Sequence, residues 1–428
     1  MRLYRWFREL QTQATRSRLS KREALVVLFG AAILMAFRFP DLVLHPRFWA
    51  EEGAVFFANA RRLPAVSFLF TPHIGYALLL TKAAALMATA VPLEWGPAVT
   101  TLLALLVQLI PFAIVLAGRS SLWNDARTQL MATLVLLFVL PNRENWLNTT
   151  GSQFVLSLAV FLLALEDRDP GTRAGLVARL SLIVLAGLTG PTSCLLLPAL
   201  AWRWFRMRTT AALGLALALL ACCLVQFAFL FDARLVSAGE LARRRSGIRP
   251  PLLAEIIFIK DLALPLLGID RAEILAGWLF DLKRWHGLIS CIALALYLAV
   301  LALALAGISR EARIPLILGL AALIVASTVF SLDDKTPLLF AMPGERYYQA
   351  PNAALFIALA SGVRGRPWPS VARAVLVAMA IGVGLTSFPQ HYWFFEDGPD
   401  WRAEIARWRA DPSVPPKVWP QGWIVQLK

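Results

Sequence analysis

Apolar runs as long as a lipid bilayer is thick recur along this 428-residue chain, from Glu23 almost to its end. A helix needs about 20 consecutive apolar residues to cross the hydrocarbon core, and a backbone in lipid must satisfy its own hydrogen bonds. The composition agrees, because 58% of the residues are hydrophobic and 16% are charged, whereas soluble domains have about 45–50% and about 25%. The sequence therefore predicts an all-α polytopic membrane protein.

Eleven membrane spans are predicted from these runs and from the charge of the connecting loops. The hydrophobic stretch Ile74–Val91 is assigned to a helix that lies in or re-enters the outer interface, because counting it as a span would place the basic loop at Arg119 outside. Lys82 in this stretch is expected to snorkel. Whether Leu252–Leu267 spans is left open. The predicted spans are 23–43, 96–117, 128–140, 154–165, 176–190, a short span ending at Trp202, 211–231, 287–307, 315–330, 350–362 and 374–388.

The basic residues behind the net charge of +15 are distributed as in a membrane protein and not as on a nucleic-acid-binding surface. Lys and Arg cluster in short loops on one predicted side, which is the positive-inside pattern. The N-terminus is therefore predicted to be cytoplasmic, in the cytoplasmic (inner) membrane, and nucleic acid is not expected as a partner. The predicted regions are a basic N-terminus (1–22), a multi-pass domain (23–388) with large outer loops at 45–95 and 232–285, and an outer-face tail (389–428).

Glu51 and Glu52 come soon after the first predicted span, where the chain has just left the bilayer. Carboxylates beside a membrane are costly to bury, because desolvation penalises their charged form, and such residues are usually functional. We predict that this acidic pair is the catalytic centre. The alternative is that the two carboxylates only cap the helix that starts at Gly53, where negative charge is favoured.

The order of several segments carries a resemblance to a known family. The acidic pair opens the amphipathic segment Glu51–Arg61, and a Pro-containing turn at 71–76 leads into a second loop helix. A basic loop follows at 118–121, and Glu345–Pro351 places an Arg-Tyr before a Pro and a hydrophobic span. In order and sidedness the chain resembles the GT-C superfamily of integral membrane glycosyltransferases. The resemblance covers roughly residues 20–205 and the patch near Arg346.

The resemblance implies an inverting glycosyltransferase that acts at the outer face. Its donor would be a polyprenyl-phosphate sugar, and its acceptor an envelope glycan, a glycolipid or a protein, with membrane lipids around it. One carboxylate would take the proton of the acceptor hydroxyl, and cationic groups would hold the leaving phosphate. No cofactor is assigned with certainty and no metal ligands are assigned, but a divalent ion, Mg or Mn, stays open.

Two departures from the family pattern concern the same site. The first acidic residue of the family is usually Asp, whereas Glu51 carries its carboxylate one methylene further out. Many members also have a Lys at the outer turn between the fifth and sixth spans. That turn is Leu188–Thr192 in this chain and contains no Lys. The phosphate contact is therefore expected from elsewhere in the chain.

The remaining candidates are polar and aromatic side chains predicted near the outer face. Those predicted to bind the donor phosphate are Arg346, Arg143, Lys260, Arg243, Arg244 and Arg245. Those predicted to contact the substrates are His73, Glu144, Trp146, Tyr347 and Tyr348. Simpler interpretations are an interface anchor for Arg346, a solvated or headgroup-binding loop for Arg243–Arg245, and an ion pair of Glu144 with Arg143 or Lys82.

Two other functions remain as alternatives to this hypothesis. An O-antigen ligase or polymerase type of enzyme would also act outside, but through outer-loop arginines without an essential carboxylate. A transporter or flippase of lipid-linked sugars would instead show inverted repeats or broken helices at mid-span depth. The halves of the chain show no repeat, and charge within the predicted spans is nearly absent.

Overall fold

The computed structural model describes residues 18–236, 249–282, 286–329, 331, 334–363, 367–388 and 398–427. Most of the basic N-terminus and the run Arg243–Arg245 lie outside the described residues, so the predictions made for them have no structural counterpart. Within the described residues the chain is nearly all helical, with one two-stranded antiparallel sheet near the C-terminus.

The elements of the chain have these bounds. The first half contains α2 (Lys21–Arg38), α3 (Asp41–Leu44), η1 (Glu52–Phe57), α4 (Ala58–Arg62), α5 (Ala65–Phe70), α6 (Leu79–Thr89), η2 (Leu93–Trp95), α7 (Gly96–Gln108), α8 (Ile110–Ala117), α9 (Ala126–Phe138), α10 (Ser152–Ala164), α11 (Arg173–Thr189), α12 (Pro191–Cys194), α13 (Leu197–Met207) and α14 (Thr210–Val236). The second half contains α16 (Pro250–Phe258), η3 (Ile259–Ala263), α17 (Leu264–Leu267), α18 (Ile269–Asp281), α19 (His286–Ala306), α20 (Arg310–Thr328), η5 (Thr336–Leu339), α21 (Glu345–Ser361), α22 (Pro367–Ser387), α24 (Trp401–Ala410), β1 (Lys417–Val418) and β2 (Trp423–Ile424).

Helices occupy all the intervals predicted as spans, but they differ in length and apolarity. Within the described ranges, five helices are long and apolar enough to cross a membrane. They are Leu93–Ala117, Thr210–Phe231, Gly287–Ala306, Arg310–Thr328 and Trp368–Ser387. The helical membrane class is therefore supported, whereas the count of eleven crossings and the side on which each loop lies stay predictions.

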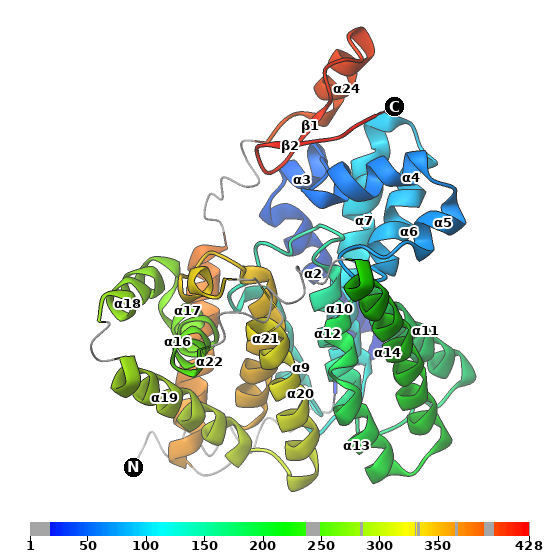
Figure 1. The fold of residues 1–428 in the computed structure, drawn as a ribbon. Coiled ribbons are helices and arrows are strands. Elements are labelled where there is room, and N and C mark those ends of the chain that lie inside the picture. The colour runs from blue at the N-terminus through cyan, green and yellow to red at the C-terminus, as the bar shows by residue number, and fades with distance from the viewer. Residues whose placement is uncertain are drawn as a thin grey trace.

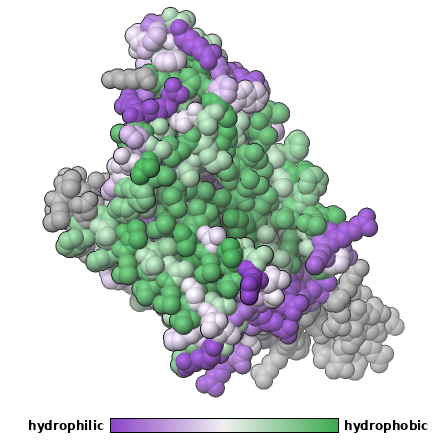
Figure 2. Space-filling model, turned by 90° about the vertical axis from the view of Figure 1, so that its right-hand side faces the viewer, coloured by the Kyte–Doolittle hydropathy of each residue, from purple (hydrophilic) through white to green (hydrophobic). Residues whose placement is uncertain are grey.

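The surface is divided by polarity in a way that suits a bilayer. Figure 2 shows a broad hydrophobic area across the middle of one face, with hydrophilic residues gathered at the top and the bottom. Large apolar side chains exposed on the long helices include Leu224 and Phe227 of α14 and Leu288 and Ile292 of α19. A monomeric soluble protein rarely exposes apolar area of this extent, so lipid is the natural covering.

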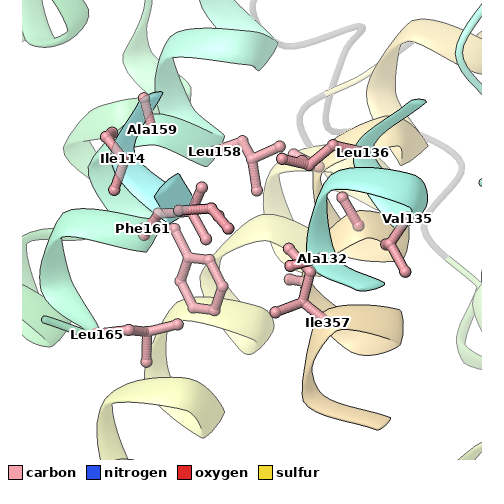
Figure 3. Packing of buried hydrophobic residues seen from close by; sticks show 14 of the residues in the cluster. Ile114, Ala132, Val135, Leu136, Leu158, Ala159, Phe161, Leu165 and Ile357 are labelled. Carbon is pink, nitrogen blue, oxygen red and sulfur yellow. The ribbon is translucent and has the colours of Figure 1, made fainter. Parts of the chain in front are cut away.

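Helix α10 is the centre of the fold, because 12 of its 13 residues are buried. Its side chains meet those of α9 and α21, as the packing around Leu158, Leu136 and Ile357 shows (Figure 3). A Cβ at Gly319 of α20 would clash with the ring of Phe161 of α10. Gly319 therefore allows a close approach of two helices, as small residues do in membrane bundles.

Around this centre the helices form two groups (Figure 1). Helices α11, α13 and α14 lie on one side, where α14 contacts both α11 and α13, and α16, α17, α19 and α22 lie on the other side. The elements that follow the first predicted span, α3 to α6, cover one end of the molecule. The site described below lies where this cover meets the bundle.

Two stretches that were hard to assign from the sequence have clear structures. In Ile74–Val91 the helix begins only at Leu79, because residues 74–78 form a turn with positive φ at Ile74, Gly75 and Leu78. Lys82 does not snorkel: it is 2% exposed, and its ammonium donates to the carbonyls of Leu69 and Thr71. The carbonyls of Leu69 and Thr71 therefore supply the polar partners that the membrane surface was expected to supply. The stretch Leu252–Leu267 forms α16, η3 and α17.

The C-terminal tail packs on the loop after the first predicted span (Figure 1). Trp401 of α24 lies edge-on to Phe48 at 5.1 Å between ring centroids, and its indole N–H donates to the carbonyl of Leu93. The backbone of Trp419 pairs with Trp49 as a parallel bridge. Trp401 and Trp419 of the tail therefore contact this loop.

Candidate functional site

A cavity of about 630 Å³ lies where the first loop, the loop after α9 and the start of α21 meet helices α10, α12 and α14. Its volume is in the usual range for small-molecule sites, about 300–1,000 Å³. One part of its lining is charged and aromatic, with Trp49, Glu51, His73, Glu144, Arg346 and Tyr347. Another part is apolar, with Leu195, Leu197, Pro198, Phe227 and Leu230. The cavity can therefore hold a ligand with a polar and an apolar end.

The two glutamates of the acidic pair have different environments. Glu51 lines the cavity and is partly exposed, whereas Glu52 is 2% exposed and does not line it. The Glu52 carboxylate accepts hydrogen bonds from the backbone N–H of Thr149 at 2.9 Å, from the Thr149 hydroxyl at 2.5 Å, and from the Trp49 N–H at 3.2 Å. Burial raises the pKa of Glu52 above its ordinary value, although these hydrogen bonds oppose the shift. Glu52 thus fastens the loop after the first predicted span to the loop after α9.

The backbone before the acidic pair is held in an unusual conformation. Ala50 has φ of 38°, in the left-handed region that L residues rarely adopt. Its N–H donates to the carbonyl of Trp419 at 2.5 Å, and the N–H of Trp419 donates to the carbonyl of Phe48 at 3.4 Å. The tail therefore braces the turn from which Glu51 enters the cavity.

Two neighbouring ion pairs connect the loop after α9 with the start of α21. Arg143 donates to both carboxylate oxygens of Glu345, and both side chains are buried. Glu144 accepts from the guanidinium of Arg346 at 2.7 Å and from the Arg346 backbone N–H at 3.0 Å. The sequence-based pairing of Glu144 with Arg143 or Lys82 is therefore wrong. The correct partner is 202 residues away in the chain, and this distance hides it from local inspection.

Arg346 is the cation at the centre of the charged part. Burial disfavours its charge, but the carboxylate of Glu144, then Tyr347 and Glu51, outweigh this effect and raise the pKa of Arg346 above its ordinary value. The guanidinium also donates to the Tyr347 hydroxyl at 3.2 Å and lies 5.0 Å from the centre of that ring. Arg346 is therefore charged at any physiological pH and is fixed beside Glu51.

The aromatic candidates His73 and Tyr347 also line this cavity. His73 lies in a tight turn, in which its backbone pairs with that of Tyr76, and its ring is edge-on to Phe56 at 5.0 Å. Tyr347 is edge-on to Phe154 of α10 at 5.2 Å. Both rings are thus oriented by packing.

Besides Glu52, four of the predicted site residues that the structure describes lie away from the cavity lining. Trp146 is buried and donates to the carbonyl of Met35, and the guanidinium of Arg38 lies 4.4 Å from its ring centre. Tyr348 is buried and donates to the carbonyl of Ser327. Lys260 is buried in η3, where its ammonium donates to the carbonyls of Ala341 and Pro343. The fourth is Arg143, whose guanidinium is held by Glu345.

Sequence reasoning missed the uncharged polar residues of the lining. They are Tyr76, Thr81, Asn145, Asn148, Thr150, Gln153, Thr192 and Gln226. Most lie within or beside apolar helices, where a single amide or hydroxyl gives no periodic or charge signal. A search for polar residues at the ends of predicted spans would have found Gln153 and Thr192.

Comparisons with known proteins and a search for metal sites give no further assignment. The chain matches no protein-family model, no curated protein and no solved structure. Within the described ranges, no three His, Cys, Asp or Glu side chains are grouped so that they could hold a metal ion. The cavity and its lining residues are therefore the feature of the molecule that points to a function.

Proposed function

We propose that this protein is a membrane glycosyltransferase that moves a sugar from a polyprenyl-phosphate donor to an acceptor hydroxyl. The acceptor would be an envelope glycan, a glycolipid or a protein, and the reaction would occur at the outer face of the cytoplasmic membrane. One observation carries the proposal: Glu51 and Arg346 line the same cavity, which is apolar at its other part. A polyprenyl-phosphate sugar has this same succession of sugar, anionic phosphate and apolar chain.

The geometry supports separate roles for Glu51 and Arg346. The carboxylate of Glu51 would accept the proton of the acceptor hydroxyl as its oxygen attacks the anomeric carbon. The bond from that carbon to the phosphate oxygen would break, and the phosphate would leave with the bonding electrons. The guanidinium of Arg346 would stabilise the charge that develops on this oxygen.

The same geometry favours Glu51 over Glu52 as the base. A general base must come within hydrogen-bond reach of the proton that it takes. Glu51 borders the cavity, and no hydrogen bond of its carboxylate is found within the described ranges. The Glu52 carboxylate is buried and accepts hydrogen bonds from Thr149 and Trp49. Glu52 would therefore act on catalysis only by holding the loop.

The test is transfer by purified protein from a panel of polyprenyl-phosphate sugars, with wild type and Glu51→Gln compared. We expect the wild type to transfer the sugar, and we expect Glu51→Gln to lose transfer but to keep donor binding. Transfer that survives in Glu51→Gln would favour a ligase type that depends on arginines. Translocation of lipid-linked sugars without any transfer would favour a flippase.

A further inference from the structure

The uncharged polar side chains of the cavity fall into two groups. In the first group the hydrogen-bonding groups are already used within the protein. The Asn148 side chain donates to the carbonyl of Glu144 and accepts from Gly151 and Thr150, and the Gln226 amide connects Gly187 with Ala77. These residues shape the wall and have little capacity left for a ligand.

Gln153 and Thr192 belong to the second group, which also contains the hydroxyl of Tyr76. Both line the cavity and both are partly exposed to it. Neither side chain has a hydrogen-bond partner among the described residues. The Gln153 amide offers two donor hydrogens and an acceptor oxygen, and the Thr192 hydroxyl offers a donor and an acceptor. They come from different elements, the first turn of α10 and the short helix α12.

The chain makes room for Gln153 at the start of α12. A Cβ at Gly190 would lie 2.5 Å from the Oε1 atom of Gln153 and 2.7 Å from its Cβ. The glycine thus lets the amide lie against the turn that carries Thr192. Phe154, the next residue of α10, packs on Tyr347, whose hydroxyl accepts from Arg346. Gln153 therefore adjoins in sequence a residue that contacts Tyr347, and Thr192 closely precedes the apolar lining residues Leu195 and Leu197.

The charge of the lining limits what this pair can bind. The only Arg or Lys among the lining residues is Arg346, which already binds Glu144, and the carboxylate of Glu51 lies in the same lining. A second anionic group on the ligand would have no further cation there. An amide beside a hydroxyl matches a ligand hydroxyl, because all three can both donate and accept.

We propose that Gln153 and Thr192 bind the hydroxyl groups of an uncharged sugar, and that they set the preference for it over an acidic sugar. This inference rests on the proposed function, because it takes the ligand to be a sugar phosphate on a lipid chain. It adds the class of sugar and the two side chains that select it. In a hexuronate an ionised carboxylate, which can only accept hydrogen bonds, replaces the CH2OH group of the hexose. Its charge has no further cation in the lining, and an acceptor of the pair that faces it is left unpaired.

The experiment measures equilibrium binding of three synthetic probes to the full-length protein in detergent or nanodiscs. The probes are a polyprenyl phosphate, the same lipid phosphate carrying a neutral hexose, and the same lipid phosphate carrying a hexuronate. The variants are Gln153→Leu and Thr192→Val, which remove the polar groups at similar size. The matched control is Thr192→Ser, which keeps the hydroxyl.

We expect the wild type to bind the neutral hexose probe more tightly than the other two. Gln153→Leu and Thr192→Val should each weaken binding of that probe by roughly threefold to tenfold, the value of one neutral hydrogen bond. Binding of the sugar-free polyprenyl phosphate should not change in either variant, and Thr192→Ser should behave as the wild type. A misfolded variant would lose all three probes together, so the sugar-free probe also reports on folding.

Three outcomes would overturn the inference. Equal loss for the sugar-bearing and sugar-free probes in a variant that keeps its thermal unfolding temperature would assign the pair to the phosphate or the lipid. If the wild type binds the hexose probe and both variants bind it equally well, Gln153 and Thr192 do not bind the sugar. The proposed function would be unaffected by this result. Absence of binding of every probe by the wild type would reject the proposed function and this inference with it.

Discussion

The lining of the cavity and the protein interior behind it are built from the same short stretches of chain. In four pairs of adjacent residues, one member lines the cavity and the other is buried behind it. The pairs are Glu51–Glu52, Arg143–Glu144, Glu345–Arg346 and Tyr347–Tyr348. Adjacent residues on a helical backbone, such as the two pairs of α21, point in directions about 100° apart, so a single turn can serve both regions. The interior members bind one another or the backbone, and this holds the cavity-lining members in place.

The largest effect is expected where the interior ion pair is broken. Glu345→Ala leaves the buried guanidinium of Arg143 without its carboxylate, which should destabilise the protein by about 3–5 kcal/mol. The measurement is the free energy of unfolding in detergent.

The matched control for this change removes both charges. Arg143→Met combined with Glu345→Leu should recover most of the lost stability, because no unpaired charge is left in the interior. If the single variant costs no more than an ordinary surface change, the interior pair does not support the cavity as described.

The next effect concerns the interior member of the acidic pair. Glu52→Leu leaves the N–H groups of Thr149 and Trp49 without their acceptor, and should cost about 1–3 kcal/mol. Glu51→Leu, on the cavity side, should change the unfolding free energy by less than about 0.5 kcal/mol. An equal loss of unfolding free energy in both variants would contradict the assignment of Glu52 to the interior and of Glu51 to the cavity lining.

The same residue should make stability depend on pH. Burial raises the pKa of Glu52 above its usual 4.5, so the folded state holds the proton more strongly than the unfolded state does. The stabilisation from this proton is complete below pH 4.5 and is lost as the pH rises through the folded-state pKa. Unfolding free energies of wild type and Glu52→Gln, measured from pH 4.5 upward, should differ in slope. Parallel curves would show that Glu52 is not buried as described.

A smaller effect separates the two tyrosines. Tyr348→Phe removes a buried hydrogen bond to Ser327, and should cost about 0.5–1.5 kcal/mol of stability. Tyr347→Phe should leave stability nearly unchanged, but it frees one donor of Arg346 and should alter ligand binding. Thermal unfolding and donor binding of both variants test this prediction. A loss of stability in Tyr347→Phe, with altered binding in Tyr348→Phe, would contradict it.

The smallest effect on stability is expected for the ion pair that lines the cavity. The side chains of Arg346 and Glu144 are 35% and 17% exposed, far more than those of Arg143 and Glu345. Solvent screens such a pair, so Glu144→Gln should cost less than about 1 kcal/mol. A cost equal to that of Glu345→Ala in the same unfolding assay would remove the distinction between the two ion pairs.

The sequence predicted the helices better than the contacts between them. An apolar run such as 211–231 needs no partner to be recognised, and α14 covers it. Glu51, Glu144 and Arg346 were found because charge close to a predicted span is conspicuous. Gln153 and Thr192 were missed because neutral residues beside apolar helices carry no such signal. Which glutamate borders the cavity depends on Thr149, 97 residues away, and no local pattern contains that contact.

The most direct test compares Glu51→Gln and Glu52→Gln in one experiment that measures the turnover number for sugar transfer and the donor dissociation constant. The account predicts that Glu51→Gln lowers turnover by about 10²- to 10⁴-fold, the usual contribution of a general base, and leaves donor binding unchanged. Glu52→Gln should lose stability but keep the turnover of the folded molecules. Loss of turnover in folded Glu52→Gln, with normal turnover in Glu51→Gln, would contradict the account.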